Sequence, residues 1–178
     1  MRTTQEWWNQ VKNSPEKLTD WLRDQFHGEM TAAPKIRELA SKFAKNNSEA
    51  TRIFNIIADQ EELHASWIAN LCISRGITPE LLNKRERYWD ETLPEIESLG
   101  TLEYASGVAA HAEQMRLERI KTIAADPTAP KDIQETFARI LPQEEFHAAS
   151  FERFATEVGM QQSEANHRKG LNALGLVV

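Results

Sequence analysis

The stretch QEELHA at residues 60–65 recurs almost unchanged as QEEFHA at residues 143–148. Each copy contains a Glu-x-x-His pair, Glu61 with His64 and Glu144 with His147. Residues three apart are neighbours on one face of an α-helix, so each pair presents a carboxylate and an imidazole side by side. The repeat therefore predicts two helices that carry the same combination of ionisable side chains.

Both copies lie within stripes of apolar residues that are spaced by alternate steps of three and four. This spacing places a stripe on one helix face, the face that packs inward. No stretch shows the period of two that is typical of strands, so the sequence predicts an all-α fold, a four-helix bundle. The four long segments begin at Ser14-Pro15, Ser48, Thr101 and the residues after PTAP (127–130), and they end near Asn46, Gly76, Ala125 and Gly159.

The link between the second and third segments, residues 77–100, is long. Thr78-Pro79-Glu80 is a start signal for a short helix, and Pro94 and Gly100 interrupt the link. A link of this length can cross the bundle, which lets the second and third helices run in the same direction. We expect a bundle domain over residues 1–159 with a short N-terminal helical segment. For the tail, residues 160–178, the sequence leaves open a loose segment, docking on the bundle or a role in an oligomer.

Each of the four stripes is interrupted near its middle by ionisable side chains. Besides the two Glu-x-x-His pairs, the first stripe contains Glu29 and the third contains Glu113. The chain thus reads as two helix hairpins, each with one single Glu and one Glu-x-x-His pair. A buried carboxylate without a partner is costly, and four in one layer repel one another, which should raise their pKa values.

Two divalent cations would balance the four carboxylate charges, and two neutral imidazoles would add nitrogen ligands. Carboxylate and imidazole ligands suit iron or manganese, and this combination is a general arrangement in carboxylate-bridged bundles. We expect two iron ions, with manganese or a mixed pair as alternatives, and no catalytic residue beyond the ligands. The predicted ligands are Glu29, Glu61, His64, Glu113, Glu144 and His147.

On these residues the chain resembles the ferritin-like di-iron carboxylate superfamily, and within it the rubrerythrin-type four-helix bundle. The resemblance covers residues 15–159 and rests on two Glu-x-x-His pairs and two single Glu residues in the family order. Rubrerythrins proper carry a rubredoxin-like cysteine module, which the lone Cys72 cannot form. They also carry a further glutamate one turn beyond the single Glu of the third helix, where this chain has Arg116.

The resemblance implies an oxidoreductase in which two Fe(II) ions reduce O₂ or peroxide, as an oxidase, a peroxidase or an oxygenase of a small organic substrate. A second reading is iron binding or storage through a ferroxidase step without an organic substrate. A third is a metal-bearing interaction or stress protein without turnover. The sequence names neither the substrate nor the electron donor, and it is compatible with a homodimer.

Composition narrows the choice of partners. The net charge of −6 disfavours nucleic acid and anionic membranes, and the basic run Lys84, Arg85 and Arg87 is interpreted as a solvated helix face. We find no run with the length of a transmembrane helix and no signal-peptide pattern at the N-terminus. A single cysteine is typical of a reducing compartment, so we expect the cytoplasm.

Overall fold

The computed structural model describes residues 3–84 and 87–175. Within these ranges the regular structure is entirely helical, which confirms the all-α prediction. None of the helices described has the length and apolar character needed to cross a bilayer. The helices are α1 (Thr4–Lys12), α2 (Pro15–Phe43), α3 (Ser48–Ser74), α4 (Arg87–Leu99), α5 (Leu102–Ala124) and α6 (Lys131–Ala173).

Local capping signals determine where most helices begin. The side chains of Thr3, Ser14, Asn47 and Thr101 each accept a hydrogen bond from a backbone N–H of the first turn that follows. Such bonds satisfy donors that the start of a helix leaves without an intrahelical partner. The predicted starts of α2, α3 and α5 are therefore confirmed.

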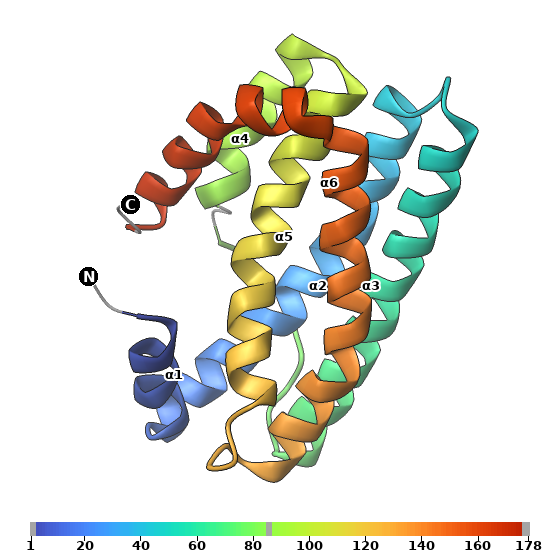
Figure 1. The fold of residues 1–178 in the computed structure, drawn as a ribbon. Helices are drawn as coiled ribbons and strands as arrows, with labels where there is room; N and C mark the ends of the chain where they lie inside the picture. Colours follow the sequence, from blue (N-terminus) through green and yellow to red (C-terminus); the bar gives the residue numbers. More distant parts are fainter. Residues whose placement is uncertain (1–2, 85–86, 176–178) are drawn as a thin grey trace.

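The bundle consists of two helix hairpins, α2 with α3 and α5 with α6, which meet mainly through α3 and α6 (Figure 1). Arg75, after the end of α3, forms an ion pair of 2.6 Å with Asp132 at the start of α6. Trp8 of α1, the helix that precedes and packs against α2, donates to Asp126, just after α5. The ends of α3 and α5 thus lie where α2 and α6 begin, so α3 and α5 run in the same direction, as a link of this length allows.

The helix of the long link begins later than its start signal predicts. Residues 77–84 are not helical, so the expected helix start at residues 78–80 is wrong. The helix of the link is α4. The backbone N–H of Leu82 donates to Nδ1 of His27 at 3.1 Å, and Lys84 pairs with Asp24 at 2.6 Å. These contacts hold the segment along α2. Arg85 of the basic run lies outside the described residues.

The fourth bundle helix does not end at Gly159 as expected. The helical backbone breaks at Thr156 (φ 57°, ψ 175°) and then continues as helix to Ala173. Gly159 lies where α6 passes close to α5, because a Cβ atom there would overlap the backbone of Glu103. This glycine therefore permits close helix packing, and the prediction that it stops the helix is wrong.

The tail docks on α4, which is one of the three options that the sequence left open. The side-chain amide of Asn166 donates to the carbonyl of Thr92 at 3.1 Å, and Oη of Tyr88 lies 2.9 Å from Nδ1 of His167. Gly170 packs directly against the ring of Tyr88. Figure 1 shows the last part of α6 turning across one end of the bundle toward α4.

Two apolar clusters fill the core and leave a polar layer between them. In α2, Leu22 belongs to one cluster and Ala33 to the other, and Glu29 lies between them. In α3, α5 and α6 the ionisable residues likewise lie between the residues that belong to one cluster and those that belong to the other. Apolar packing thus holds the predicted ligands in one layer, away from both ends of the bundle.

Asp126 fastens α1 to the bundle. Trp8 is fully buried, and its indole N–H donates to Oδ2 of Asp126 at 2.8 Å, where Lys12 also donates at 2.6 Å. The backbone and hydroxyl of Thr128 donate to Oδ1 at 2.9 and 2.7 Å. Burial raises the pKa of Asp126, but these donors outweigh it and hold the pKa well below its usual range.

We expect Asp126→Asn to destabilise the protein by about 2 kcal/mol, because Lys12 loses a charged partner in a largely buried place. A depressed pKa means that the carboxylate stabilises the fold above its unfolded-state pKa, and that this contribution is lost as the pH falls through the folded-state pKa. Urea unfolding at about pH 7 and about pH 3 should therefore show that the difference in unfolding free energy between the wild type and Asp126→Asn is smaller at the lower pH. The control Asp132→Asn removes an exposed ion pair and should cost less than about 1 kcal/mol. Equal losses for the two variants would contradict this account of Asp126.

Candidate metal centre

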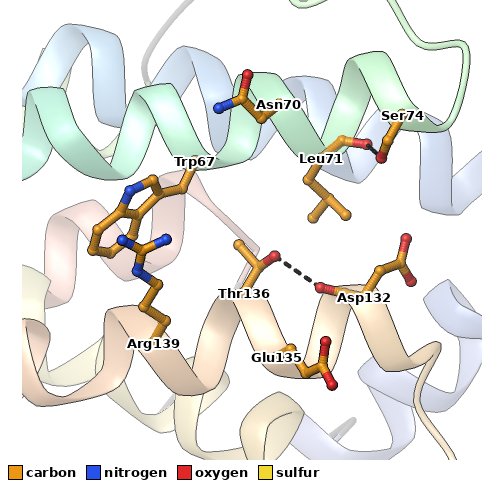
Figure 2. Close-up of a pocket in the computed structure, with 8 residues that line it drawn as sticks. All are labelled: Trp67, Asn70, Leu71, Ser74, Asp132, Glu135, Thr136 and Arg139. Carbon is orange, nitrogen blue, oxygen red and sulfur yellow. Dashed lines mark hydrogen bonds between the residues drawn. The ribbon is translucent and has the colours of Figure 1, made fainter.

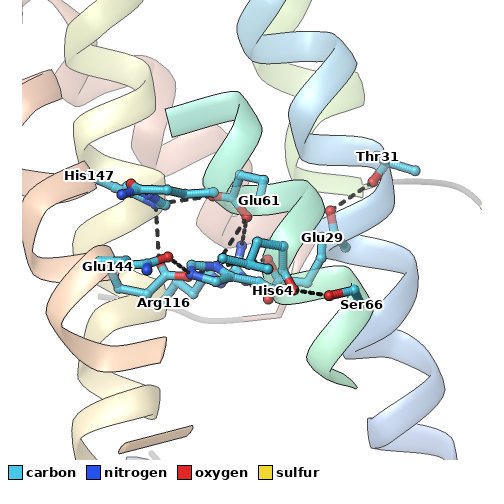
Figure 3. A network of polar contacts seen from close by, with 12 residues as sticks. Glu29, Thr31, Glu61, His64, Ser66, Arg116, Glu144 and His147 are labelled. Carbon is cyan, nitrogen blue, oxygen red and sulfur yellow. Dashed lines mark hydrogen bonds and ion pairs between the residues drawn. The ribbon is translucent and has the colours of Figure 1, made fainter. Parts of the chain in front are cut away.

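The structure brings all six predicted ligands into one layer. Glu29 comes from α2, Glu61 and His64 from α3, Glu113 from α5, and Glu144 and His147 from α6. All are fully buried except Glu113, which is 9% exposed. Figure 3 shows the side chains of α2, α3 and α6 converging in the middle of the bundle.

Their ligand atoms form two groups, within each of which one atom per residue lies within 4.8 Å of the others. The His64-side group consists of Glu29, Glu61, His64 and Glu144, and the His147-side group consists of Glu61, Glu113, Glu144 and His147. Glu61 and Glu144 belong to both. Elsewhere in the described ranges, no other set of three or more His, Cys, Asp or Glu residues converges in this way.

Glu61 and Glu144 lie between the two imidazoles. Oε1 of Glu61 is 3.2 Å from Nδ1 of His147, and Oε2 is 3.8 Å from Nδ1 of His64. Oε1 of Glu144 is 3.2 Å from Nδ1 of His64, and Oε2 is 3.8 Å from Nδ1 of His147. Each carboxylate thus turns one oxygen toward each histidine, which is the placement of a ligand that bridges two positions.

Two glutamines orient the imidazole rings across the hairpin interface. Nε2 of His147 donates to Oε1 of Gln60 at 2.9 Å, and Nε2 of His64 donates to Oε1 of Gln143 at 2.8 Å. An amide oxygen only accepts, so a neutral ring keeps its proton on Nε2 and turns the Nδ1 lone pair toward the carboxylates. We did not assign the glutamines from sequence, although both occupy the first place of the repeated stretch.

Arg116 also enters the centre, which was not predicted. Its Nη2 contacts Oε1 of Glu29 and lies 3.4 Å from Oε1 of Glu144, and its Nη1 lies 3.7 Å from Oε2 of Glu61 (Figure 3). The side chain is 23% exposed, whereas those of its three partners are 0% exposed. Two signals in the sequence pointed toward the centre: its place three residues after Glu113, on the same helix face, and its position where rubrerythrins carry a further glutamate.

Burial and neighbouring carboxylates change the protonation of two groups. Burial, with the charges of Glu144 and Glu61, raises the pKa of Glu113 well above its ordinary value. Burial lowers the pKa of His64, but Glu144 and Glu61 outweigh it and raise this pKa to about 9. Without metal, a proton on each of these side chains therefore offsets part of the buried negative charge.

The pKa values of Glu61 and Glu144, the two carboxylates shared by both groups, shift the other way. Burial raises the pKa of Glu61, but His147 and His64 lower it below the ordinary value. Burial likewise raises the pKa of Glu144, and the guanidinium of Arg116 contributes most to lowering it. The expectation that crowding raises the carboxylate pKa values is thus confirmed for Glu113 and wrong for Glu61 and Glu144, because the two imidazoles lower the pKa of the first and the Arg116 guanidinium lowers that of the second.

Many buried atoms that face the centre lack a hydrogen-bond partner among the described residues. They are Oε2 of Glu29 and Glu113, both carboxylate oxygens of Glu61 and Glu144, and Nδ1 of His64 and His147. Buried polar atoms in proteins are normally satisfied. Oxygen and imidazole nitrogen atoms of this kind are ligands that iron and manganese accept, so the donor set fits two metal ions.

A surface pocket of about 360 Å³ opens between α3 and α6 near the centre (Figure 2). None of the six predicted ligands lines it. Trp67 connects the two features, because it lines the pocket and its ring centroid lies 5.6 Å from that of His64. Arg139, which also lines the pocket, stacks over the Trp67 ring at 3.8 Å from its centroid.

Comparison with known families decides the classification. A family model for rubrerythrin matches residues 20–155. The chain belongs to the rubrerythrin family. The match confirms the predicted resemblance and the ferritin-like bundle, and it contains all six residues of the two groups. Comparison with curated proteins and with solved structures gives no match.

The rubrerythrin match covers part of the described fold. It ends at Ala155, immediately before the break at Thr156. The helix that docks on α4 therefore lies outside the part shared with the family model, as does α1. The matched part contains most of the two hairpins, with the six ionisable residues of the polar layer, and α4.

In this rubrerythrin-family centre, we expect Gln60→Leu to weaken Fe(II) binding on the order of 10- to 100-fold, because His147 loses the acceptor that orients its ring. Gln143→Leu should act in the same way through His64. Anaerobic competition titration against a chelator measures both affinities. The control is Gln114→Leu, because the Gln114 amide donates to an exposed carboxylate away from the six ligands, that of Glu152 at 3.4 Å. Affinities equal to that of the control would contradict the role of the two glutamines.

Proposed function

We propose that this protein binds two iron ions between its hairpins and uses them to reduce O₂ or peroxide. The observation that carries the proposal is the pair of buried donor groups that share Glu61 and Glu144. Glu29 and His64 would complete one position, and Glu113 and His147 the other. Two divalent ions balance four carboxylates, and manganese or a mixed pair would satisfy the same donors.

Bound iron would supply the electrons for reduction of the oxidant. The chain holds the two metal positions in place and controls how the oxidant reaches them. Glu61 and Glu144 hold the two positions side by side, and Gln60 and Gln143 fix the rings that complete them. Apolar clusters above and below exclude water from the layer.

Access to the centre favours a small oxidant. Of the six ligands only Glu113 is exposed at all, at 9%, and Arg116 beside it is 23% exposed. This narrow contact with solvent suits O₂ or peroxide better than a bulky molecule. Turnover would also need an electron donor outside residues 1–178, because the single buried cysteine cannot form a rubredoxin-like module.

Iron binding with a ferroxidase step, without an organic substrate, is the second candidate. The observation that favours it is that the pocket beside the centre is lined by none of the six ligands. Both candidates begin with oxidation of Fe(II), and storage would additionally need a closed shell of subunits. Light scattering tests the storage form of this candidate, since a monomer or a homodimer excludes a cage.

The test is to load the protein with Fe(II) without oxygen, count the metal and then add O₂ or peroxide. We expect about two ions per chain, a rise in the melting temperature on loading and stoichiometric consumption of the oxidant. Glu61→Ala and Glu144→Ala should abolish full loading. The neighbouring Glu62 and Glu145 are exposed, so Glu62→Ala and Glu145→Ala are matched controls that should load normally.

Three outcomes would count against the proposal in different ways. Full loading of Glu61→Ala and Glu144→Ala would refute the bridging ligands. Loading without any consumption of O₂ or peroxide would favour a metal-bearing protein without turnover. A melting temperature that does not respond to metal would contradict a well-formed centre.

A further inference from the structure

The guanidinium of Arg116 lies against the His64-side group of the centre, and the oxygens that face His147 have no such cation among the described residues. We propose that Arg116 occupies the His64-side position until a second metal ion arrives, so that the His147-side position is filled first and the second ion binds only as Arg116 withdraws. This inference rests on the metal centre proposed above, and it assigns to Arg116 control over how many ions the centre holds.

The contacts of Arg116 fall on the oxygen atoms of one half. Glu29 belongs to the His64-side group alone. Oε1 of Glu144, which lies 3.4 Å from the guanidinium, is also the oxygen 3.2 Å from Nδ1 of His64. Oε2 of Glu61, at 3.7 Å from Arg116, is the oxygen that faces His64. The guanidinium therefore lies against the oxygens that a metal ion on the His64 side would need.

The His147-side oxygens are turned away from Arg116. Oε1 of Glu61 faces His147 at 3.2 Å, and Oε2 of Glu144 faces the same ring at 3.8 Å. Within the described residues, every ion contact of Arg116 is to a His64-side oxygen. An ion can therefore bind on the His147 side while all the contacts of Arg116 stay in place.

A second ion cannot bind in the same way. A guanidinium and a divalent cation that share carboxylate oxygens repel each other, and the dry interior screens this repulsion weakly. Arginine also satisfies carboxylates well through its planar set of donors, so its contacts have to be broken before a metal replaces them. The apparent affinity for the second ion is then reduced by the fraction of molecules in which Arg116 is withdrawn.

The position of Arg116 at the surface gives it a way out. Its side chain is 23% exposed, whereas Glu29, Glu61 and Glu144 are fully buried. A long arginine side chain can move its charged head into water while its stem stays on the helix surface. Withdrawal toward solvent would leave the His64-side oxygens free for the incoming ion.

Anaerobic calorimetric titration with Fe(II) tests the inference directly. The wild-type chain should show two binding events whose affinities differ on the order of tenfold or more. Arg116→Gln should tighten the weaker event so that the two become similar. The matched control is Arg119→Gln, which removes the same charge from the same helix, although the guanidinium of Arg119 lies over the ring of Trp7 at 5.0 Å. It should titrate as the wild type does.

The order of filling is tested in chains that retain Arg116, so the result does not depend on whether Arg116→Gln folds without metal. Glu29 and Glu113 each belong to one group only. Glu29→Gln should remove the weaker event, and Glu113→Gln should remove the tighter one. The reverse pattern would overturn the order.

The remaining outcomes separate this inference from the proposed function. Two equally tight events in both the wild type and Arg116→Gln would overturn the role of Arg116 and leave the two-metal centre standing. No Fe(II) binding by the wild-type chain would overturn both.

Discussion

Burial of four carboxylates in one layer is the constraint on which the rest of this molecule depends. Charged groups in a dry interior gain little net stability from one another and need compensation by cations, protons or metal. The free energy that keeps the layer buried comes instead from the apolar clusters on either side, with Phe54 and Phe151 in one and Trp8 and Phe137 in the other. The clusters stabilise the bundle, and the layer between them carries its chemistry.

The repeated stretch links folding to the geometry of the centre. Gln60 on one hairpin orients His147 on the other, and Gln143 orients His64 in return. Neither ring is fixed until the hairpins dock, so an isolated hairpin would have its donors without their orientation. Assembly of the two halves therefore creates the bridging positions and the ring orientations in the same step.

The sequence was sufficient wherever the signal is local. Caps such as Ser14 and Thr101 act within one turn, and the helical period places all six ionisable residues inward. Sequence-based prediction failed where contacts between distant parts of the chain determine the role of a residue. Gly159 is equally suited to end a helix and to let two helices touch, and only the position of α5 shows which applies. Arg116 has a long, flexible side chain, and its destination depends on carboxylates from three other helices.

The two halves of the near-twofold repeat differ at the position of Arg116. Arg116 lies three residues after Glu113, and the equivalent position after Glu29 is Ala32, whose side chain cannot reach the centre or carry charge. The carboxylates and imidazoles are thus duplicated, but the guanidinium is not. The negative charge of four carboxylates is balanced by two divalent ions, or by one ion together with Arg116 and a proton. Two ions together with Arg116 would carry more positive charge than the four carboxylates can balance. On the inferred order of filling, one residue that differs between the halves, Arg116 against Ala32, is therefore enough to give two similar ligand sets different affinities for the metal.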